Sequence, residues 1–481
     1  MAKQWKHTFS KFYNGQTNDS FIPTGDKYLS SNGIEPVLHP RYLELAPSIF
    51  TNATVPVSAD ISSIVEIPWF NTLYIGSGNV YYNSTDKSSV VLWTTYQQAW
   101  YLYDSAWALK VFIFDATNVI RMNADLTTKE DSDAHATGNV TAVCNDANSI
   151  LFAIWSIIYK VDSTSTITNA FSSTVTFSPL PYWSIIKKLF IFNGTLYIFS
   201  TIWSDTVIYQ ALLNSSNVYT INYQHTIKGV ILRDMAWSGG DMFWIWQQVW
   251  WTSGSGLYKT SGIDSQKIQS VSFTSLSKCS FINNDYLGII DGQNYYRYGS
   301  SIPWFPKAFV KLLTHTVNFT AISGEYLATT LSGGNIIQCG LGSNTYQTTG
   351  EIVTMPYDAG TIWAEKNLDV IDFPYELKTG KTGASIQVQC QTNLMELNST
   401  TTYVNIATLN TLWNTIMRFR IDKPQILAAL ASENPDFQYI RFKIIINGWL
   451  PDWSGRSQYS PKVYQDIFIS GGFLNDADTY L

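Results

Sequence analysis

The stretch YLGIIDGQNYY, from Tyr286 to Tyr296, contains the pattern that decides the fold. An apolar segment is followed by Asp291-Gly292 and then, from Asn294 on, by aromatic residues. Aspartate, asparagine and glycine tolerate the positive φ angles of a tight turn, and aromatic and β-branched residues favour strands. The stretch therefore predicts a β-hairpin.

The same pattern recurs along the chain, clearly in LYIGSGNVYY, VFIFDATNVI and YLATTLSGGNII and more weakly in three further copies. Consecutive copies start 38 to 46 residues apart, close to the ~40–50 residues of a four-stranded propeller blade. We therefore predict a seven-bladed β-propeller over residues 56–360, in preference to a generic all-β domain with evenly spaced hairpins. The seven copies begin at Leu73, Val111, Ile150, Leu196, Met242, Tyr286 and Tyr326.

The segments on either side of the repeat differ from it. Residues 1–55 contain several phenylalanines and prolines without a helical period, which indicates an extended N-terminal arm. Residues 361–481 contain period-two alternation at Ser385–Gln391 and longer strand-like segments at Tyr439–Ile446 and Val463–Ser470. We interpret residues 361–481 as a C-terminal β-sandwich.

One helix is expected inside this sandwich. Asp422 is a candidate N-cap and Pro424 suits a first helical turn. Ile426, Leu427 and Leu430 follow with a spacing that predicts one shared apolar face. The predicted fold class is therefore all-β: a seven-bladed β-propeller followed by a C-terminal β-sandwich with one inserted helix.

The composition excludes several classes of protein. Charged residues make up 14% of the chain and the net charge is −6, whereas about 25% of residues are charged in a typical soluble protein. Coiled coils and helical solenoids need more charge, and disordered chains have fewer aromatic residues than the 15% found here. The acidic balance argues against a nucleic-acid partner. Low charge also gives little repulsion between copies, which suits a protein that works inside an assembly or outside a cell.

Signals for a membrane, a secretory leader or zinc are weak. The longest apolar stretch, Ile150–Tyr159, is about half of a membrane-spanning helix, and the N-terminal residues lack an apolar leader segment. We expect no membrane insertion. The cysteines are far apart, which predicts small buried apolar residues rather than a zinc site and suits folding in a reducing cytoplasm. They are Cys144, Cys279, Cys339 and Cys390.

No motif of a known catalytic chemistry is present in the sequence. None of the histidines has the spacing of a metal-ligand pair, and no nucleophile elbow or phosphate-binding loop occurs. The acidic cluster Glu130, Asp131 and Asp133 lies in a turn-rich stretch, where a solvated loop is favoured over a calcium site. We therefore expect no catalytic residue, no cofactor and no metal.

A tryptophan-rich tract is the most unusual local feature. Alternating aromatic residues in a propeller normally pack between neighbouring blades, so Trp244 and Trp246 are expected in the core, with a glycan platform as the alternative. Trp250 and Trp251 approach a Gly/Ser turn. They are therefore candidate contacts with a glycan or with another protein.

The loop from Trp449 to Arg456, between two sandwich strands, is a second candidate surface. It contains Trp449, Trp453 and Arg456, and tryptophan and arginine dominate the energetics of protein interfaces. An interface and a glycan contact remain open for both surfaces.

The order of arm, degenerate propeller and C-terminal sandwich resembles virion structural proteins of tailed bacteriophages, of the tail hub, nozzle and adaptor type. The resemblance implies an architecture that covers most of the chain, without transferable catalytic residues. The stretches that carry it are Ser30–Pro36 continuing to Pro40-Arg41, Lys366–Phe373, and Tyr439–Ile446 with Val463–Ser470.

The resemblance implies a non-enzymatic, multi-copy structural component of a bacteriophage virion, in the tail or its attachment region and assembled in the host cytoplasm. The implied partners are other copies of this chain and other virion proteins, contacted through the propeller faces and the arm. Two alternatives stay open. One is a tail fibre protein that binds a host surface glycan or receptor, and the other is a propeller enzyme that degrades glycans.

Overall fold

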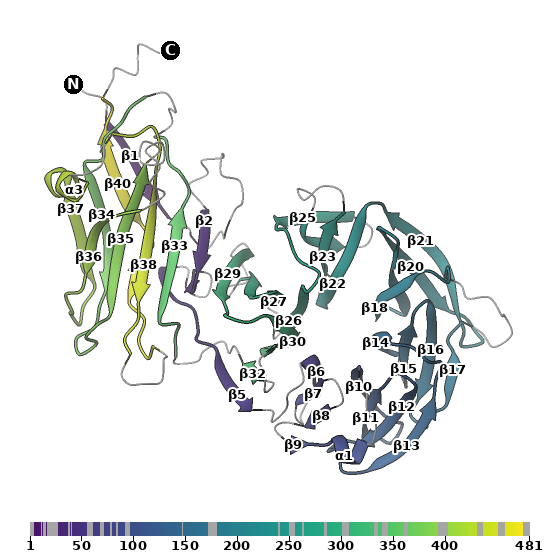
Figure 1. Ribbon diagram of the computed structural model, residues 1–481. Coiled ribbons are helices and arrows are strands. Elements are labelled where there is room, and N and C mark those ends of the chain that lie inside the picture. The colour runs from purple at the N-terminus through teal and green to yellow at the C-terminus, as the bar shows by residue number, and fades with distance from the viewer. Residues whose placement is uncertain are drawn as a thin grey trace. The chain divides into compact units, whose positions relative to one another are not determined.

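The computed structural model consists almost entirely of strands, with two short helices among the residues it describes (Figure 1). No helix in these segments is long and apolar enough to cross a membrane. The chain divides into two compact units, one comprising Phe50–Gln293 and Thr316–Gln338 and the other the remaining segments. The structure describes residues 4–10, 12, 16, 27–36, 39, 41–54, 61–67, 72–76, 79–82, 85–91, 97–146, 148–171, 180–238, 241–249, 255–261, 264–282, 286–300, 307–330, 335–338, 345–359, 364–392, 403–430, 436–450 and 457–474.

Seven four-stranded antiparallel sheets follow one another along the chain, as the blades of a propeller do. Helix α1 (Ser88–Val91) follows the first of them. The first four sheets are β6 (Ile61–Glu66), β7 (Thr72–Gly76), β8 (Asn79–Tyr82) and β9 (Thr85–Asp86); β10 (Gln98–Tyr103), β11 (Leu109–Phe114), β12 (Asn118–Asn123) and β13 (Lys129–Ala134); β14 (Val140–Asp146), β15 (Ser149–Ile154), β16 (Ile157–Asp162) and β17 (Ile167–Asn169); β18 (Ile185–Phe192), β19 (Thr195–Ile202), β20 (Asp205–Leu213) and β21 (Tyr219–Ile227). The last three are β22 (Val230–Ser238), β23 (Asp241–Gln248), β24 (Gly256–Ser261) and β25 (Asp264–Ser270); β26 (Lys278–Ile282), β27 (Tyr286–Asp291), β28 (Asn294–Gly299) and β29 (Ala308–Thr314); β30 (Phe319–Ser323), β31 (Tyr326–Thr329), β32 (Asn335–Gln338) and β5 (Phe50–Thr54).

The predicted seven-fold repeat is confirmed. Every repeat copy starts at, or within two residues of, the first residue of the second strand of a sheet, and its turn joins the second and third strands. In the hairpin that begins at Tyr286, the Asp291 carboxylate is buried and accepts hydrogen bonds from the backbone N–H and the hydroxyl of Thr274 (2.8 and 2.6 Å) and from the Ser277 hydroxyl (2.7 Å). Asp291, at the turn of the hairpin, therefore also holds the segment Thr274–Ser277 that precedes the first strand of the sheet.

The first strands of the seven sheets form a closed ring. In chain order, β6, β10, β14, β18, β22, β26 and β30 each contact the next, and β30 contacts β6. The last sheet is completed by β5, which pairs antiparallel with β32 although the two strands are far apart in the sequence. The ring is therefore closed by a strand that precedes the first repeat.

A β-bulge recurs in five of these first strands, at Ser62, Thr141, Lys187, Arg233 and Thr320. A bulge leaves the extra residue out of the hydrogen-bond ladder and increases the local twist. The Lys278 ammonium on β26 donates to the carbonyl oxygens of Ser62 (3.0 Å) and Thr320 (2.7 Å). One lysine thus links the sixth, seventh and first sheets, using backbone groups at the bulges.

Asp234 on β22 makes a second link across the first strands. Its carboxylate accepts a hydrogen bond from the Lys188 ammonium on β18 (2.7 Å) and another from the backbone N–H of Cys279 on β26 (2.9 Å). Burial lowers the pKa of Lys188, but the Asp234 carboxylate raises it more and leaves it above its usual value. Three consecutive sheets are therefore joined through one carboxylate.

The other unit contains the predicted β-sandwich, with one hydrophobic core built from both of its sheets. Its strands come from residues 4–45 and from β33 as well as from the predicted range 361–481, because long-range pairing decides which strands join the sheets. The predicted strand segments at Ser385–Gln391 and Tyr439–Ile446 fall on β35 and β38. One sheet has the order β1 (Gln4–Phe9), β40 (Ile467–Gly472), β34 (Val370–Glu376), β39 (Lys462–Tyr464), β4 (Tyr42–Leu45) and β3 (Ile34–Glu35), with β37 (Met417–Asp422) also paired to β34. The other has the order β2 (Tyr28–Asn32), β33 (Thr349–Thr354), β38 (Ile440–Asn447), β35 (Ser385–Thr392) and β36 (Val404–Leu409).

Residues 1–55, for which we expected an extended arm, supply five strands. β1 pairs with β40, and β2 pairs with β33. β3 and β4 extend the same sheet as β1, whereas β5 completes the last blade. Each of these strands finds its partner through pairing at long range, apart from the pair formed by β3 and β4.

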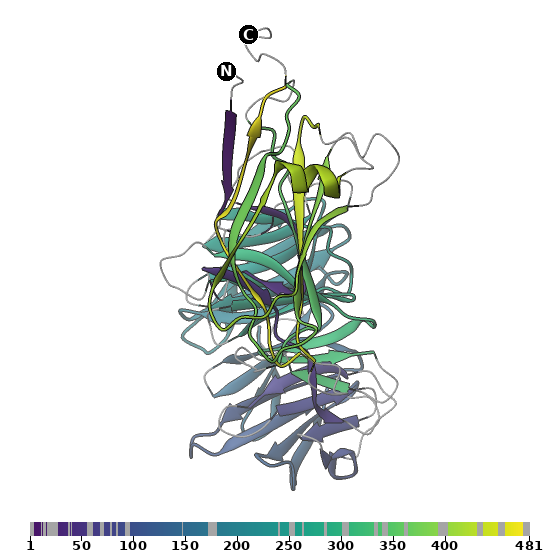
Figure 2. The same cartoon turned by 90° about the vertical axis from the view of Figure 1, so that its left-hand side faces the viewer.

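The inserted helix is α3 (Lys423–Ala429), which follows β37 and is yellow-green in Figure 2. Its N-cap is Asp422, as predicted, and the Asp422 backbone N–H donates to the Gln425 side-chain oxygen (3.2 Å). Ile426 and Leu430 are buried, but Leu427 is 39% exposed. The prediction of a shared face was therefore wrong for Leu427, because this short helix packs only one narrow stripe against the sheet.

Replacing Lys278 with methionine tests the link at the ring closure. The variant leaves the carbonyl oxygens of Ser62 and Thr320 without the ammonium, and we expect a loss of about 1–3 kcal/mol in the free energy of unfolding. The control is Lys259→Met, which removes an ion pair with Asp241 whose two side chains are 34% and 28% exposed, and it should cost less than about 1 kcal/mol. Urea denaturation measures both, and equal losses would contradict the role of Lys278.

Lys366 in the sandwich unit gives a pH prediction. It is fully buried, its ammonium donates to the Gln438 carbonyl oxygen (2.7 Å), and burial lowers its pKa from 10.5 to about 8. Between these two pH values the unfolded state binds more protons, so stability rises with pH, by about 1 kcal/mol from pH 7 to pH 9. Denaturation curves of Lys366→Met should lack this rise. The exposed control Lys423→Met should retain it.

Candidate functional site

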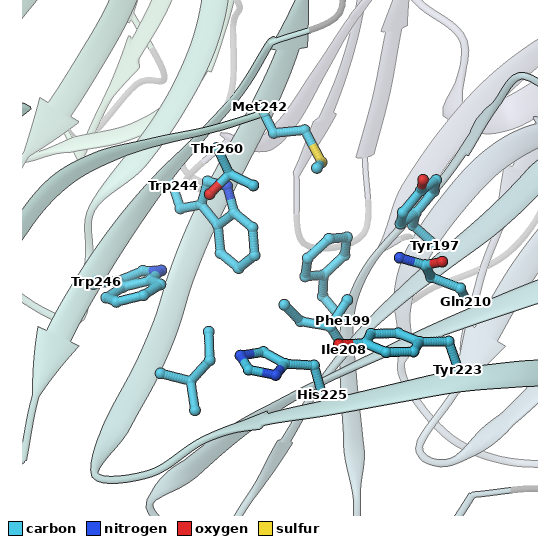
Figure 3. Close-up of a pocket in the computed structure, with 11 residues that line it drawn as sticks. Tyr197, Phe199, Ile208, Gln210, Tyr223, His225, Met242, Trp244, Trp246 and Thr260 are labelled. Atoms are coloured by element: carbon cyan, nitrogen blue, oxygen red, sulfur yellow. The ribbon is translucent and has the colours of Figure 1, made fainter. Parts of the chain in front are cut away.

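A cavity of about 280 Å³ lies between the sheets β18–β21 and β22–β25 (Figure 3), and we call it the blade pocket. Seven of its lining residues come from the first of these sheets and four from the second. They are Tyr197, Phe199, Ile208, Gln210, Tyr223, His225 and Ile227 on one wall, and Met242, Trp244, Trp246 and Thr260 on the other.

Strand alternation places these side chains in the pocket. Successive side chains of a strand point to opposite faces of its sheet. The pocket residues occupy every second position of their strands, as do Tyr223, His225 and Ile227 on β21 and Met242, Trp244 and Trp246 on β23. The two walls are therefore the facing surfaces of neighbouring blades.

The floor of the pocket is aromatic and tightly packed. Phe199 meets Trp244 edge to face at 5.0 Å between ring centroids, and Trp244 meets Trp246 in the same way at 5.7 Å. Trp246 is stacked on Tyr258 at 4.2 Å. One face of the Trp246 ring is therefore backed by another ring, which holds the indole in place.

Three polar atoms in this floor are unsatisfied. Trp244, Trp246 and Thr260 are 2%, 7% and 2% exposed. Within the described part of the chain, no group forms a hydrogen bond with the indole Nε1 of either tryptophan or with the Thr260 hydroxyl. Burying such groups without partners costs free energy. The lining also contains no aspartate, glutamate, lysine or arginine.

A second group of aromatic residues lies at one edge of two neighbouring sheets, and we call Trp155, Tyr182, Trp183 and Trp203 the aromatic rim. Their exposed fractions are 54%, 80%, 51% and 85%. Trp155 occupies the turn between β15 and β16, and Trp203 occupies the equivalent turn between β19 and β20. Both have positive φ angles, 54° and 56°, which cost about 1–3 kcal/mol in a residue other than glycine.

Hydrogen bonds and strand register bring the rim together. The backbone N–H of Ile186, near the start of β18, donates to the carbonyl oxygen of Trp155 (3.0 Å). Ile185 pairs with Thr201, two residues before Trp203. Tyr182 and Trp183 lie three and two residues before the first residue of β18, and their rings meet edge to face at 4.8 Å. All four side chains therefore belong to one edge of the third and fourth blades.

Most of the site residues predicted from the sequence lie outside the described residues; these are Trp250, Trp251, Trp453 and Arg456. Trp449 is described and is half-buried against the sandwich core. Its backbone bridges to Tyr459, and the Lys381 ammonium lies 3.5 Å from the centroid of its ring. A cation–π contact of this kind stabilises the local fold.

Trp244 and Trp246, expected in the core, are buried between two blades and also line the cavity. The acidic cluster does not form a loop: Glu130, Asp131 and Asp133 lie on β13. Glu130 forms ion pairs with Lys110 and Arg121. No group of acidic, histidine or cysteine side chains suited to a metal occurs among the described residues.

The cysteines agree with the expectation of small buried residues where they are described. Cys144, Cys279 and Cys390 are buried, and burial raises the pKa of each thiol, to about 12 for Cys390. Cys339 lies outside the described residues.

The sequence analysis missed the aromatic rim and the pocket. The rim has a sequence signal, because Ile-Trp-Ser occurs at Ile154–Ser156 and again at Ile202–Ser204, in the same turn of successive repeats. Tryptophan is not a turn-forming residue, so turn preferences do not predict an exposed tryptophan at this position. The pocket has no such signal, because it depends on how two facing sheets fit together.

No family model and no curated protein matches the sequence. Among solved structures, the chain is similar to the computationally designed Ika8 protein, at 8% identity and a TM-score of 0.39, over 63% of this chain and 87% of that one. The Neurospora crassa Pan2 WD40 domain is similar at 10% identity and a TM-score of 0.41, over 59% and 90%. A structure of the mitotic checkpoint complex is similar at 13% identity and a TM-score of 0.38, over 60% and 93%. These similarities are too low to support an argument about function, and the fold rests on the sheet order and strand contacts given above.

Proposed function

We propose that this chain is a non-enzymatic structural component of a bacteriophage virion, present in several copies in the tail or its attachment region. It is assembled in the host cytoplasm and contacts other copies of itself and other virion proteins. The sequence resemblance to tail hub, nozzle and adaptor proteins suggests this role. The aromatic rim is the observation of the structure that supports it best.

The rim supports the proposal through its exposure and its backbone cost. Large aromatic side chains lose little conformational entropy on binding, and tryptophan is enriched at interface hot spots. Trp155 and Trp203 keep positive φ angles at two equivalent turns, where glycine would remove the strain. Trp107 also combines high exposure with a positive φ, so the backbone angle alone does not mark an interface. The gathering of four exposed aromatic side chains at one edge of two blades is what favours burial against a neighbouring subunit.

Low charge and the fold give further support. Seven sheets around closed first strands form a rigid body with short, protected edges. With 14% charged residues, identical copies repel one another weakly when they are packed side by side. Both properties suit a spacer or docking plate in a ring of subunits.

The double variant Trp155→Gly with Trp203→Gly tests the rim. We expect an unchanged or higher melting temperature, because the turn strain is relieved. Incorporation into particles should fall about tenfold or more, because interface tryptophans carry much of the binding energy. Quantitative immunoblotting of purified particles measures incorporation, and circular dichroism measures the melting temperature.

The matched control is Trp107→Gly. Trp107 is 84% exposed with a φ of 60°, but it lies in a turn between a first and a second strand, β10 and β11. It should be incorporated as wild type. Immunogold labelling of particles from the source of the sequence tests the role itself, and particles without label, or full incorporation of the double variant, would contradict the proposal.

A further inference from the structure

We infer that the outer edge of β21 is a contact surface for a second copy of this chain, which pairs with it through its own β21. β21 is the last strand of the fourth sheet, and within the described residues no strand pairs with its outer side (Figure 1). This contact is one of those between copies in the proposed function, and it rests on that function only in expecting several copies to meet.

The outer edge of β21 is long and open. β21 has nine residues, whereas the outermost strands of the other six sheets have two to seven. At this length it spans about 30 Å. Outside the ladder to β20, the only backbone group of β21 with a backbone partner in the described part of the chain is the N–H of Tyr219, which donates to the Ala170 carbonyl oxygen (3.1 Å). A second strand can therefore add to this edge.

The edge lacks the charges that protect other sheet edges. Native proteins prevent edges from pairing with short strands, charged side chains or bulges. β13 contains three acidic residues, and β25 contains Asp264 and Lys267. β21 contains no aspartate, glutamate, lysine or arginine. Its one such device is a bulge at Asn222, and the ladder to β20 is regular from Tyr223 to Ile227.

The exposed side chains of β21 suit a meeting of two copies. They occupy alternate positions and are Thr220, Asn222, Gln224 and Thr226. Hydroxyl and amide groups can both donate and accept hydrogen bonds, so each can pair with its own kind. Threonine pairs across antiparallel strands are stabilising. None of the four side chains is apolar, so the contact depends on backbone hydrogen bonds, as in the addition of a strand to a sheet.

Charge indicates that the partner strand is another β21. In a two-fold antiparallel pair each residue meets a residue of the same strand, so an edge with charges of one sign opposes like charges. Self-pairing of β13 would place carboxylates opposite carboxylates. Self-pairing of β21 opposes neither carboxylates nor ammonium groups in any register. The strand also has no charge with which to attract a charged segment of a different protein.

The edge and the aromatic rim belong to the same blade. Trp203 occupies the turn between β19 and β20, and β20 pairs with β21 from Thr206 to Leu213. None of the rim side chains lies on β21. The two contacts can therefore be tested separately.

Sedimentation velocity of the purified full-length protein measures the self-association. We expect a concentration-dependent dimer of the wild type. The double variant Gln224→Lys with Thr226→Lys opposes like charges and should weaken the dimer about tenfold or more. Both side chains are exposed and outside the blade pocket, so the melting temperature should remain that of the wild type. The matched control is Ser132→Lys with Ala134→Lys, at exposed positions with the same spacing on β13, which should dimerise as the wild type does.

A charge swap distinguishes pairing between two β21 strands from any other effect of the lysines. Gln224→Glu with Thr226→Glu should also weaken the dimer when the variant is alone. An equimolar mixture of the glutamate and lysine variants should dimerise at least as tightly as the wild type, because opposite charges now meet. Such restoration requires that two copies meet through this strand.

Four outcomes would overturn the inference. They are a wild type that stays monomeric at high micromolar concentration, equal dimerisation of the lysine variant and the wild type, equal weakening by the β13 control, and no restoration in the mixture. A dimeric chain that is missing from particles would contradict the proposed function and leave the β21 contact intact. A monomeric chain that is present in particles would do the reverse.

Discussion

Closure of the ring of first strands is the constraint on which the rest of the structure depends. A single four-stranded sheet has no core of its own, so each blade is stable only between two neighbours, and β30 must reach β6. The devices described above act at or near this ring: β5 completes the last sheet, Lys278 binds carbonyls at two bulges, and Asp234 joins three first strands. The outer strands and hairpin tips of each sheet are attached to this ring only through the inner strands of the same sheet. The rim lies at such tips, whereas the pocket is lined by second, third and fourth strands.

The parts that the sequence predicted are the local ones. The hairpin between the second and third strands is encoded within about a dozen residues, and the Asp422 cap precedes its helix directly. The partner of β5 is β32, which follows the other six sheets in the sequence, so their pairing leaves no local pattern and residues 1–55 resembled an arm. The positions of the β-bulges cannot be predicted from the local sequence either. Lys278 looks like any strand lysine until Ser62 and Thr320 are brought to it by closure.

The tryptophans also differ in how far the local sequence predicts their positions in the structure. Alternation along β23 placed Trp244 and Trp246 in the space between blades, and they are buried. That they also line a cavity depends on the residues opposite them, such as Tyr223 and His225, which belong to another repeat. Trp155 is the reverse case. Its position in the repeat was visible, but turn statistics give no reason to expect an exposed tryptophan at positive φ.

Two features without an evident benefit in the free chain lie in neighbouring parts of the propeller. The turns at Trp155 and Trp203 belong to the third and fourth sheets, and the unsatisfied atoms of Trp244, Trp246 and Thr260 lie between the fourth and fifth. Asp234 joins the first strands of the fourth, fifth and sixth sheets, so these costs fall where the ring has an additional link. Unfavourable local geometry persists where the surrounding structure determines it, and it gathers at functional sites. The proposed protein contact of the rim therefore lies on blades that are joined to the ring by strand pairing and by Asp234.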